Sequence, residues 1–76
     1  MKGMVNMSQI TLKAARVNAG LTQGQVAAAI GVAVSTIRNW EHCITYPKQP
    51  HIMALCSLYG VAYDDIIFLP NKLALS

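Results

Sequence analysis

Charged residues are scarce in this sequence: six Lys or Arg and three Asp or Glu make up 12% of its 76 residues. A disordered segment combines a high net charge with few apolar residues, whereas 54% of these residues are hydrophobic. Aromatic residues are also few, at 7%, so the apolar excess is aliphatic. The composition therefore excludes a disordered segment and favours one compact helical domain with a small core.

Long hydrophobic runs are missing as well. The longest apolar stretch, residues 26–34, has nine residues and is interrupted by Gly31, whereas a membrane-spanning helix needs about 20. Residues 1–9 lack the apolar segment of a secretory signal peptide. We therefore expect no membrane association and a location in the cytoplasm.

Only two cysteines are present, Cys43 and Cys56, and they do not form a C-x-x-C pair. Without an export signal, this usage favours two free thiols over a disulfide. His42 and His51 could complete a zinc site with them, but the spacing matches no familiar zinc pattern. No spacing pairs these residues into a catalytic site either. We therefore expect no metal, no cofactor and no enzymatic activity.

The few charges are unevenly distributed along the chain. Residues 1–48 carry five basic residues and one acidic residue, a net charge of +4, whereas residues 49–76 carry one basic and two acidic residues, a net charge of −1. A domain that presents one end to phosphates is expected to show such an asymmetry. The distribution therefore points to nucleic acid more clearly than the overall charge of +3 does.

Glycines and a capping box delimit two helices in the first half of the chain. The first predicted helix ends at Gly20, which tolerates the left-handed conformation that closes a helix. The second begins at the capping box Thr22-x-x-Gln25 and ends at Gly31. Apolar residues at helical spacing support both helices: Leu12, Ala15 and Ala19 in the first, and Val26, Ala27 and Ile30 in the second.

The segment from Ala33 to about His42 is predicted to be a helix with two different faces. At about 100° per residue, one face groups Ala33, Thr36, Ile37 and Trp40. The opposite face groups Val34, Ser35, Arg38 and Asn39. We expect the first face to pack on the core, which leaves the second available for a ligand.

The second half of the chain is predicted to hold a loop and two further helices. The loop covers residues 43–49, the next helix carries Pro50 in its first turn and ends at Gly60, and a short helix runs from Tyr63 to Phe68. Five short helices without a sheet make an all-α fold, in one domain over residues 1–76 with a core of about residues 9–69 and short tails. The expected hydrophobic core is Leu12, Ala15, Leu21, Val26, Ala27, Ile30, Val32, Ile37, Trp40, Leu55 and Ile66.

The two helices that flank Gly31 and Val32 form a helix-turn-helix arrangement. Its residues, with those around it, follow a recognisable order: Gly20-Leu21-Thr22-Gln23, Ala27, Ile30-Gly31-Val32, Ser35-Thr36-Ile37, Trp40-Glu41, Pro47, Leu55, Gly60-Val61 and Asp64-Asp65-Ile66. In these residues the chain resembles the XRE-type family, which includes phage repressors and Cro proteins, from about Leu12 to Phe68. The resemblance implies a compact five-helix, lambda-repressor-like domain that binds a double-stranded DNA operator.

The resemblance also implies roles for individual residues. Helix 33–42 would enter the major groove, where Val34, Ser35, Arg38 and Asn39 match the positions that reach base edges. Arg38 suits guanine and Asn39 suits adenine, although each could contact the DNA backbone instead, and Val34 suits a thymine methyl group unless it is partly buried. Residues expected to contact phosphates are Thr22, Gln23 and Lys48. Arg16 and Glu41 match a pair that bridges the first and third helices.

Among the departures of the chain from the family pattern, two bear on the third helix and the loop after it. Ala33 stands where Ser or Thr commonly caps the third helix. The loop after Glu41 carries Cys43, Ile44 and Tyr46 in place of the usual glycine and basic residues. We therefore expect fewer phosphate contacts than in a strongly basic DNA-binding protein.

Apolar residues gather beyond the fourth predicted helix: Tyr63, Phe68, Leu69, Leu73 and Leu75. They suggest a homodimer on a two-fold operator, although simple packing of the tail would also explain them. The sequence favours a transcriptional repressor of phage or mobile-element type. The alternative is an antitoxin-like module that uses the same fold mainly to bind a protein partner.

Overall fold

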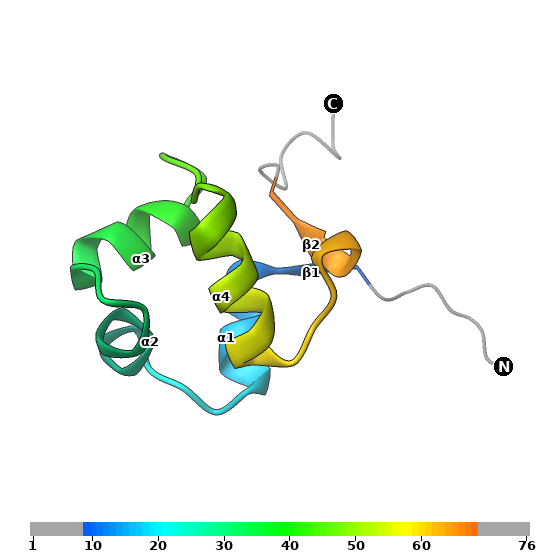
Figure 1. The fold of residues 1–76 in the computed structure, drawn as a ribbon, viewed down its shortest axis with the longest axis horizontal. Helices are drawn as coiled ribbons and strands as arrows, with labels where there is room; N and C mark the ends of the chain where they lie inside the picture. Colours follow the sequence, from blue (N-terminus) through cyan, green and yellow to red (C-terminus); the bar gives the residue numbers. More distant parts are fainter. Residues whose placement is uncertain (1–8, 69–76) are drawn as a thin grey trace, which may run out of the picture.

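Four α-helices make up most of residues 9–68, the part of the chain that the computed structural model describes (Figure 1). They are α1 (Leu12–Asn18), α2 (Gln23–Ile30), α3 (Val34–Glu41) and α4 (Gln49–Tyr59). Two short strands, β1 (Ile10–Thr11) and β2 (Ile66–Ile67), and the 3-10 helix η2 (Tyr63–Asp65) complete the fold. None of the described helices is long and apolar enough to cross a membrane.

Local signals set the ends of the helices close to the predicted positions. The capping box is confirmed, because Thr22 Oγ1 accepts from the Gln25 backbone N–H at 3.0 Å and Gln25 Oε1 accepts from the Thr22 backbone N–H at 2.8 Å. Gly31 and Gly60 end α2 and α4 in the left-handed conformation, with φ of 86° and 71°, which glycine adopts without a steric penalty. Ala33 precedes α3 without any side-chain capping bond.

The prediction of a fifth α-helix and of a domain without a sheet is wrong. Instead of a helix over residues 63–68, one turn of 3-10 helix leads into β2. This strand pairs in parallel with β1, with Ile10 opposite Ile66 and Thr11 opposite Ile67. All four residues are β-branched, so their stiff side chains favour an extended backbone once a partner strand is present.

The hydrophobic core follows the predicted residues closely. Of the residues expected in it, eight are buried, and Leu21, Ile30 and Val32 pack at its edge. Tyr59 on α4, which is not among the residues expected in the core, completes it. The eight are Leu12, Ala15, Val26, Ala27, Ile37, Trp40, Leu55 and Ile66.

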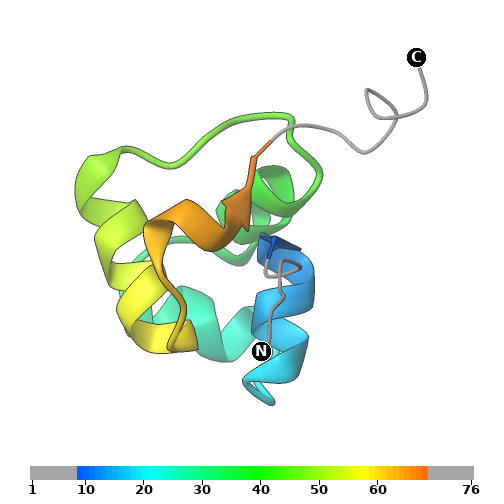
Figure 2. The same ribbon diagram turned by 90° about the vertical axis from the view of Figure 1, so that its right-hand side faces the viewer.

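The elements are arranged so that the helix-turn-helix unit lies at one side of the domain. In Figure 1, α2 and α3 are on the left, α1 and α4 are in the middle, and the strands are on the right. Figure 2 views the domain from the side of the strands and shows β2 next to β1 at the start of α1. The packed interior therefore holds α3 from one side and leaves its other side open.

Candidate nucleic-acid interface

Helix α3 is divided into a buried side and an open side. Ile37 and Trp40 are only 1% and 6% exposed, which fixes the buried side to the core. On the other side, Val34, Ser35 and Arg38 are exposed, and Asn39 is half-buried. The four residues predicted to read bases therefore share one side of one helix. Ala33, which was grouped with the core residues, is exposed and lies just before the helix.

The turn between α2 and α3 holds the two helices in a defined arrangement. The carbonyl of Ala27 accepts two backbone N–H groups, from Gly31 at 2.8 Å and from Val32 at 3.0 Å. Val32 also packs against the core. Both contacts limit rotation of α3 relative to α2, as expected of a helix-turn-helix unit.

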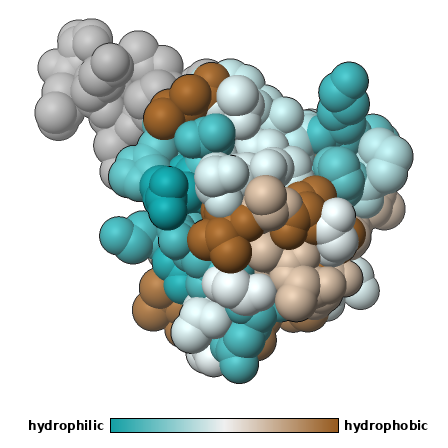
Figure 3. Space-filling view, turned by 90° about the vertical axis from the view of Figure 1, so that its left-hand side faces the viewer, coloured by the Kyte–Doolittle hydropathy of each residue, from teal (hydrophilic) through white to brown (hydrophobic). Residues whose placement is uncertain are grey.

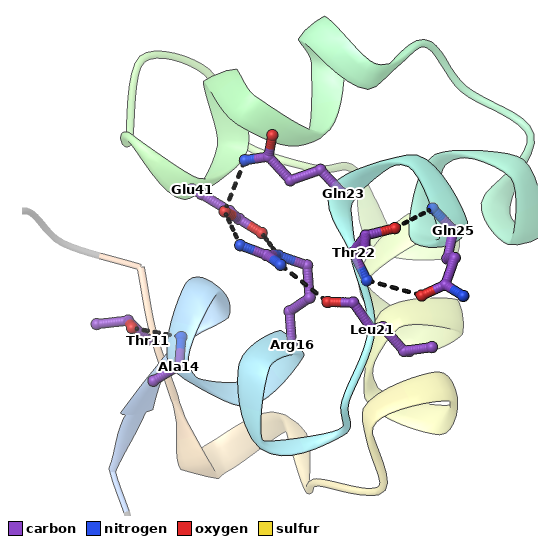
Figure 4. A network of polar contacts seen from close by, with 8 residues as sticks. All are labelled: Thr11, Ala14, Arg16, Leu21, Thr22, Gln23, Gln25 and Glu41. Carbon is purple, nitrogen blue, oxygen red and sulfur yellow. Dashed lines mark hydrogen bonds and ion pairs between the residues drawn. The ribbon is translucent and has the colours of Figure 1, made fainter.

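An ion pair links α1 to the end of α3. Arg16 Nε donates to Glu41 Oε2 at 2.6 Å, and Arg16 Nη2 donates to Glu41 Oε1 at 3.2 Å (Figure 4). The two side chains are 11% and 3% exposed, so this bidentate contact is largely shielded from water. The hydrogen bond to Glu41 raises the pKa of Arg16 above its ordinary value.

Two further contacts extend this pair into a network that also reaches α2. Arg16 Nη1 donates to the carbonyl oxygen of Leu21 at 2.9 Å, in the connection between α1 and α2. Gln23 Nε2 donates to Glu41 Oε1 at 3.0 Å (Figure 4). No local sequence pattern predicts this second contact, because it joins residues 18 positions apart. Glu41 therefore connects α1, α2 and α3.

The side chain of Tyr59 is an uncharged neighbour of this network. Its side chain is buried on α4, and burial raises the pKa of Tyr59 to about 12. The nearby Glu41 carboxylate raises this pKa further, whereas Arg16 lowers it. The phenol stays neutral at physiological pH, and the charge of the network therefore comes from Arg16 and Glu41.

The three residues predicted to contact phosphates lie at helix starts. Thr22 is the cap of α2, Gln23 is its first residue, and Lys48 is the residue before α4. Thr22 and Lys48 are exposed, and Gln23 is half-buried beside Glu41. The positive end of a helix macrodipole lies near each of them, which favours an anion there.

The loop after α3 is shaped by a residue in an unusual backbone conformation. Cys43 has a φ of 59° and is the one non-glycine residue with positive φ within residues 9–68. Its Sγ donates to the carbonyl oxygen of Phe68 at 3.4 Å. Farther along the loop, Ile44 and Tyr46 are 67% and 52% exposed, whereas Pro47 is buried. The predicted loop is therefore anchored at both ends and presents apolar side chains between them.

The residues predicted to form a dimer contact are only partly described. Tyr63 is 51% exposed and its ring lies 6.1 Å from the half-buried ring of Phe68, measured between centroids. Leu69, Leu73 and Leu75 lie outside the described residues. In Figure 1, η2 and β2 lie on the side of the domain away from the start of α3. Any contact made by Tyr63 would therefore be separate from the open side of α3.

Metal-binding side chains do not gather anywhere in residues 9–68: no group of three His, Cys, Asp or Glu residues is placed to share an ion. Cys43 and Cys56 are free thiols. Burial raises the pKa of Cys56, so this thiol stays protonated. His51 instead lies against Trp40, with ring centroids 5.2 Å apart.

Comparison with known proteins agrees with the geometry. The family model described as "Helix-turn-helix" (HTH_3) matches residues 12–66, which include all four α-helices. No curated protein and no solved structure gives a significant match. The family match covers well over half of the chain, and this domain family typically consists of DNA-binding regulators. The chain therefore belongs to the XRE-type helix-turn-helix family of DNA-binding transcription regulators.

Proposed function

We propose that the protein recognises a short operator in double-stranded DNA and acts as a repressor of phage or mobile-element type. The observation that carries this proposal is the division of α3. Ile37 and Trp40 attach one side to the core, and the opposite side presents four small or hydrogen-bonding residues. A helix held in this way fits the major groove, where base edges are accessible.

Base recognition would depend mainly on two side chains of α3. The guanidinium of Arg38 can donate two hydrogen bonds to O6 and N7 of guanine, and the amide of Asn39 can pair with N6 and N7 of adenine. Arg38 is exposed, and Asn39 is half-buried at the same side of the helix. Ser35 can donate to or accept from any base, so it contributes little to specificity.

Phosphate binding would come from the helix starts. One N–H of the Gln23 side-chain amide is bonded to Glu41, which leaves the second N–H available for a phosphate oxygen. In the first turn of α2, the backbone N–H of Gln25 is bonded to Thr22, whereas those of Gln23 and Gly24 lack partners within the helix and favour an anion. Thr22 keeps a hydroxyl proton to donate, and Lys48 adds a full positive charge.

A single comparison tests this function. Duplexes selected from a random pool are compared with scrambled duplexes at several salt concentrations. We expect Arg38→Ala and Asn39→Ala each to cost about 1–3 kcal/mol on the selected duplex and to relax the preference at one base pair. Lys48→Ala should instead weaken both duplexes alike and reduce the salt slope by about 1.

Lys13→Ala serves as the matched control for Lys48, because it removes the same charge from an exposed position on α1. If Arg38→Ala and Asn39→Ala weaken selected and scrambled duplexes equally, α3 does not read sequence. If no selected duplex binds better than a scrambled one, the proposal is wrong.

A second candidate function is an antitoxin-like module that binds a protein partner. The observation in its favour is the loop after α3, where exposed Ile44 and Tyr46 stand in place of basic residues. Tight binding of a partner protein together with the absence of any DNA affinity would support this alternative.

A further inference from the structure

His42 lies at the end of the open side of α3. It is the C-cap residue of the helix, and its side chain is exposed. Its backbone N–H donates to the carbonyl oxygen of Arg38 at 3.0 Å, as in a continuing α-helix. Val34, Arg38 and His42 follow one another at four-residue spacing, so their exposed side chains form one row along the helix. This row therefore ends in an imidazole.

Backbone hydrogen bonds fix the turn that follows His42. The N–H of Cys43 donates to the carbonyl oxygen of Trp40 at 3.2 Å, and the N–H of Ile44 donates to that of Asn39 at 2.9 Å. Because Trp40 is buried in the core, these bonds tie the turn to a fixed part of the domain. The backbone of His42 therefore has a defined position relative to α3.

Permanent positive charge is missing from this end of α3. Residues 39–47 contain no Lys or Arg. Figure 3 shows the side of the molecule that carries α2 and α3, where hydrophobic residues gather from the centre of the face toward one edge. Histidine is the side chain that ordinarily changes its charge between about pH 5 and 8. Between Arg38 and Lys48, His42 is therefore the one residue that can become a cation in this range.

The helices that pack against α3 offer His42 no free carboxylate. α1 carries Lys13 and Arg16, and α2 carries no ionisable residue. On α3 itself, both carboxylate oxygens of Glu41 are bonded to Arg16. A positive charge on His42 would therefore keep its attraction for an anion outside the protein.

The chain after His42 supplies no acidic partner either. The ionisable residues of the loop are Cys43, Tyr46 and Lys48. Helix α4 contains no Asp or Glu, and its His51 lies against the ring of Trp40. Asp64 and Asp65 belong to η2, and within residues 9–68 neither forms an ion pair with His42. A cation at His42 is therefore not neutralised by the part of the chain that the structure describes.

We propose that protonation of His42 creates a contact with a DNA phosphate, so that the protein binds DNA more tightly as the pH falls. This inference rests on the proposed entry of α3 into the major groove and adds a condition to it. When the start of such a helix reaches base edges, its end lies toward the sugar-phosphate backbone. An imidazolium donates from both ring nitrogens and carries a charge, which makes it a stronger phosphate ligand than neutral imidazole.

Proton binding and DNA binding are coupled with a definite sign. A phosphate beside the imidazole favours the charged form, so formation of the complex takes up a proton. The additional affinity is therefore present at about pH 5.5 and is lost as the pH rises toward about pH 8. Because one more phosphate is neutralised at the lower pH, the salt slope should also be larger there by about 1.

The test measures binding to a duplex selected from a random pool at about pH 5.5 and about pH 8, in the same salt. We expect the unmodified protein to bind about fivefold more tightly at the lower pH, the effect of one exposed charge contact. His42→Gln should bind at both pH values as the unmodified protein does at the higher one. His42→Lys places a permanent cation at the same position and should bind tightly at both.

His51→Gln is the matched control, because it removes the other histidine of the chain. It should retain the pH effect, since His51 lies against Trp40 and not in the row of Val34 and Arg38. Circular dichroism at both pH values ensures that folded proteins are compared. A scrambled duplex should show the same pH effect as the selected one, because a phosphate contact carries no sequence information.

The outcomes distinguish this inference from the function on which it rests. If the protein prefers the selected duplex but binds it equally at both pH values, the inference is overturned and the proposed function stands. A pH effect that persists in His42→Gln assigns the proton to another group, and the inference is likewise wrong. If no duplex is preferred but all bind more tightly at low pH through His42, the proposed function fails and the inference stands.

Discussion

Cys43 shows what a single residue contributes to the shape of the loop after α3. Its φ of 59° places it in the left-handed region, which costs an L-residue with a Cβ roughly 1–2 kcal/mol. The thiol donates to the carbonyl oxygen of Phe68, and this contact offsets part of the strain. The usual glycine of the family would have no such strain, so the departure identified in the sequence has a visible structural cost.

The strain at Cys43 leads to a stability prediction. Cys43→Gly and Cys43→Ala both remove the thiol contact, and only the alanine variant retains a Cβ in the left-handed region. We expect the glycine variant to be more stable than the alanine variant by about 1 kcal/mol in urea unfolding. Equal stability of the two variants would mean that the loop relaxes without strain at this position.

At the scale of single residues, contacts within a few positions were predictable and distant ones were not. Thr22 and Gln25 are three positions apart, so their mutual capping follows from the sequence alone. The contact of Gln23 with Glu41 exists only because the turn at Gly31 brings the start of α2 close to the end of α3. The residues expected to touch DNA remain predictions that the experiments above test.

At the scale of elements, the helices were predictable and the sheet was not. The helices have apolar residues at helical spacing, and α1, α2 and α4 also have end signals, which a local pattern reveals. The strand Ile66–Ile67 has its partner at Ile10–Thr11, 56 positions earlier, so no local window contains both. A short apolar run such as residues 66–68 is ambiguous between helix and strand until the partner is known.

The network around Glu41 joins three elements, and a double-mutant cycle measures its strength. Glu41→Ala leaves the largely buried guanidinium of Arg16 without a counter-charge, so we expect a loss of about 3–5 kcal/mol in the free energy of unfolding. Arg16→Ala should cost a similar amount, and the double variant less than the sum of both. Thermal or urea unfolding provides the measurement.

Because such losses can unfold a small domain completely, Glu41→Gln is the informative milder variant. Its amide oxygen still accepts a hydrogen bond from Arg16, so its stability should lie between that of the native protein and that of Glu41→Ala. Losses that simply add in the double variant would show that the two residues act independently.

At the scale of the whole molecule, folding keeps the charge asymmetry of the sequence, because the ion pair joins two residues of the same half of the chain. Arg16 is paired with Glu41, which leaves Lys13, Arg38 and Lys48 as the basic residues without an ion-pair partner in the part that the structure describes. Asp64 and Asp65 lie in η2, on the side away from the start of α3 (Figure 1). The segregation of acidic charge was predictable from the sequence, whereas the neutralisation of Arg16 followed only from the family resemblance.

The side that carries η2 leads to a prediction about assembly. We expect two copies to bind a two-fold operator through a contact that includes Tyr63, which is 51% exposed. Tyr63→Ser should weaken binding of the second copy, and Met53→Ser is the matched control because it removes a similarly exposed apolar side chain from α4. The mass of the protein–DNA complex gives the number of copies, and a single copy on a saturated two-fold operator would contradict the prediction.

The parallel pairing of β1 with β2 has a mechanical consequence. When residues 9 and 68 are pulled apart, the forces act in opposite directions along two strands that run the same way. The bonds between the strands are then loaded together in shear, whereas an antiparallel pair at the two ends would open one bond at a time. The smallest element of the domain is therefore the one that resists tension along the chain, and the helices separate only after it yields.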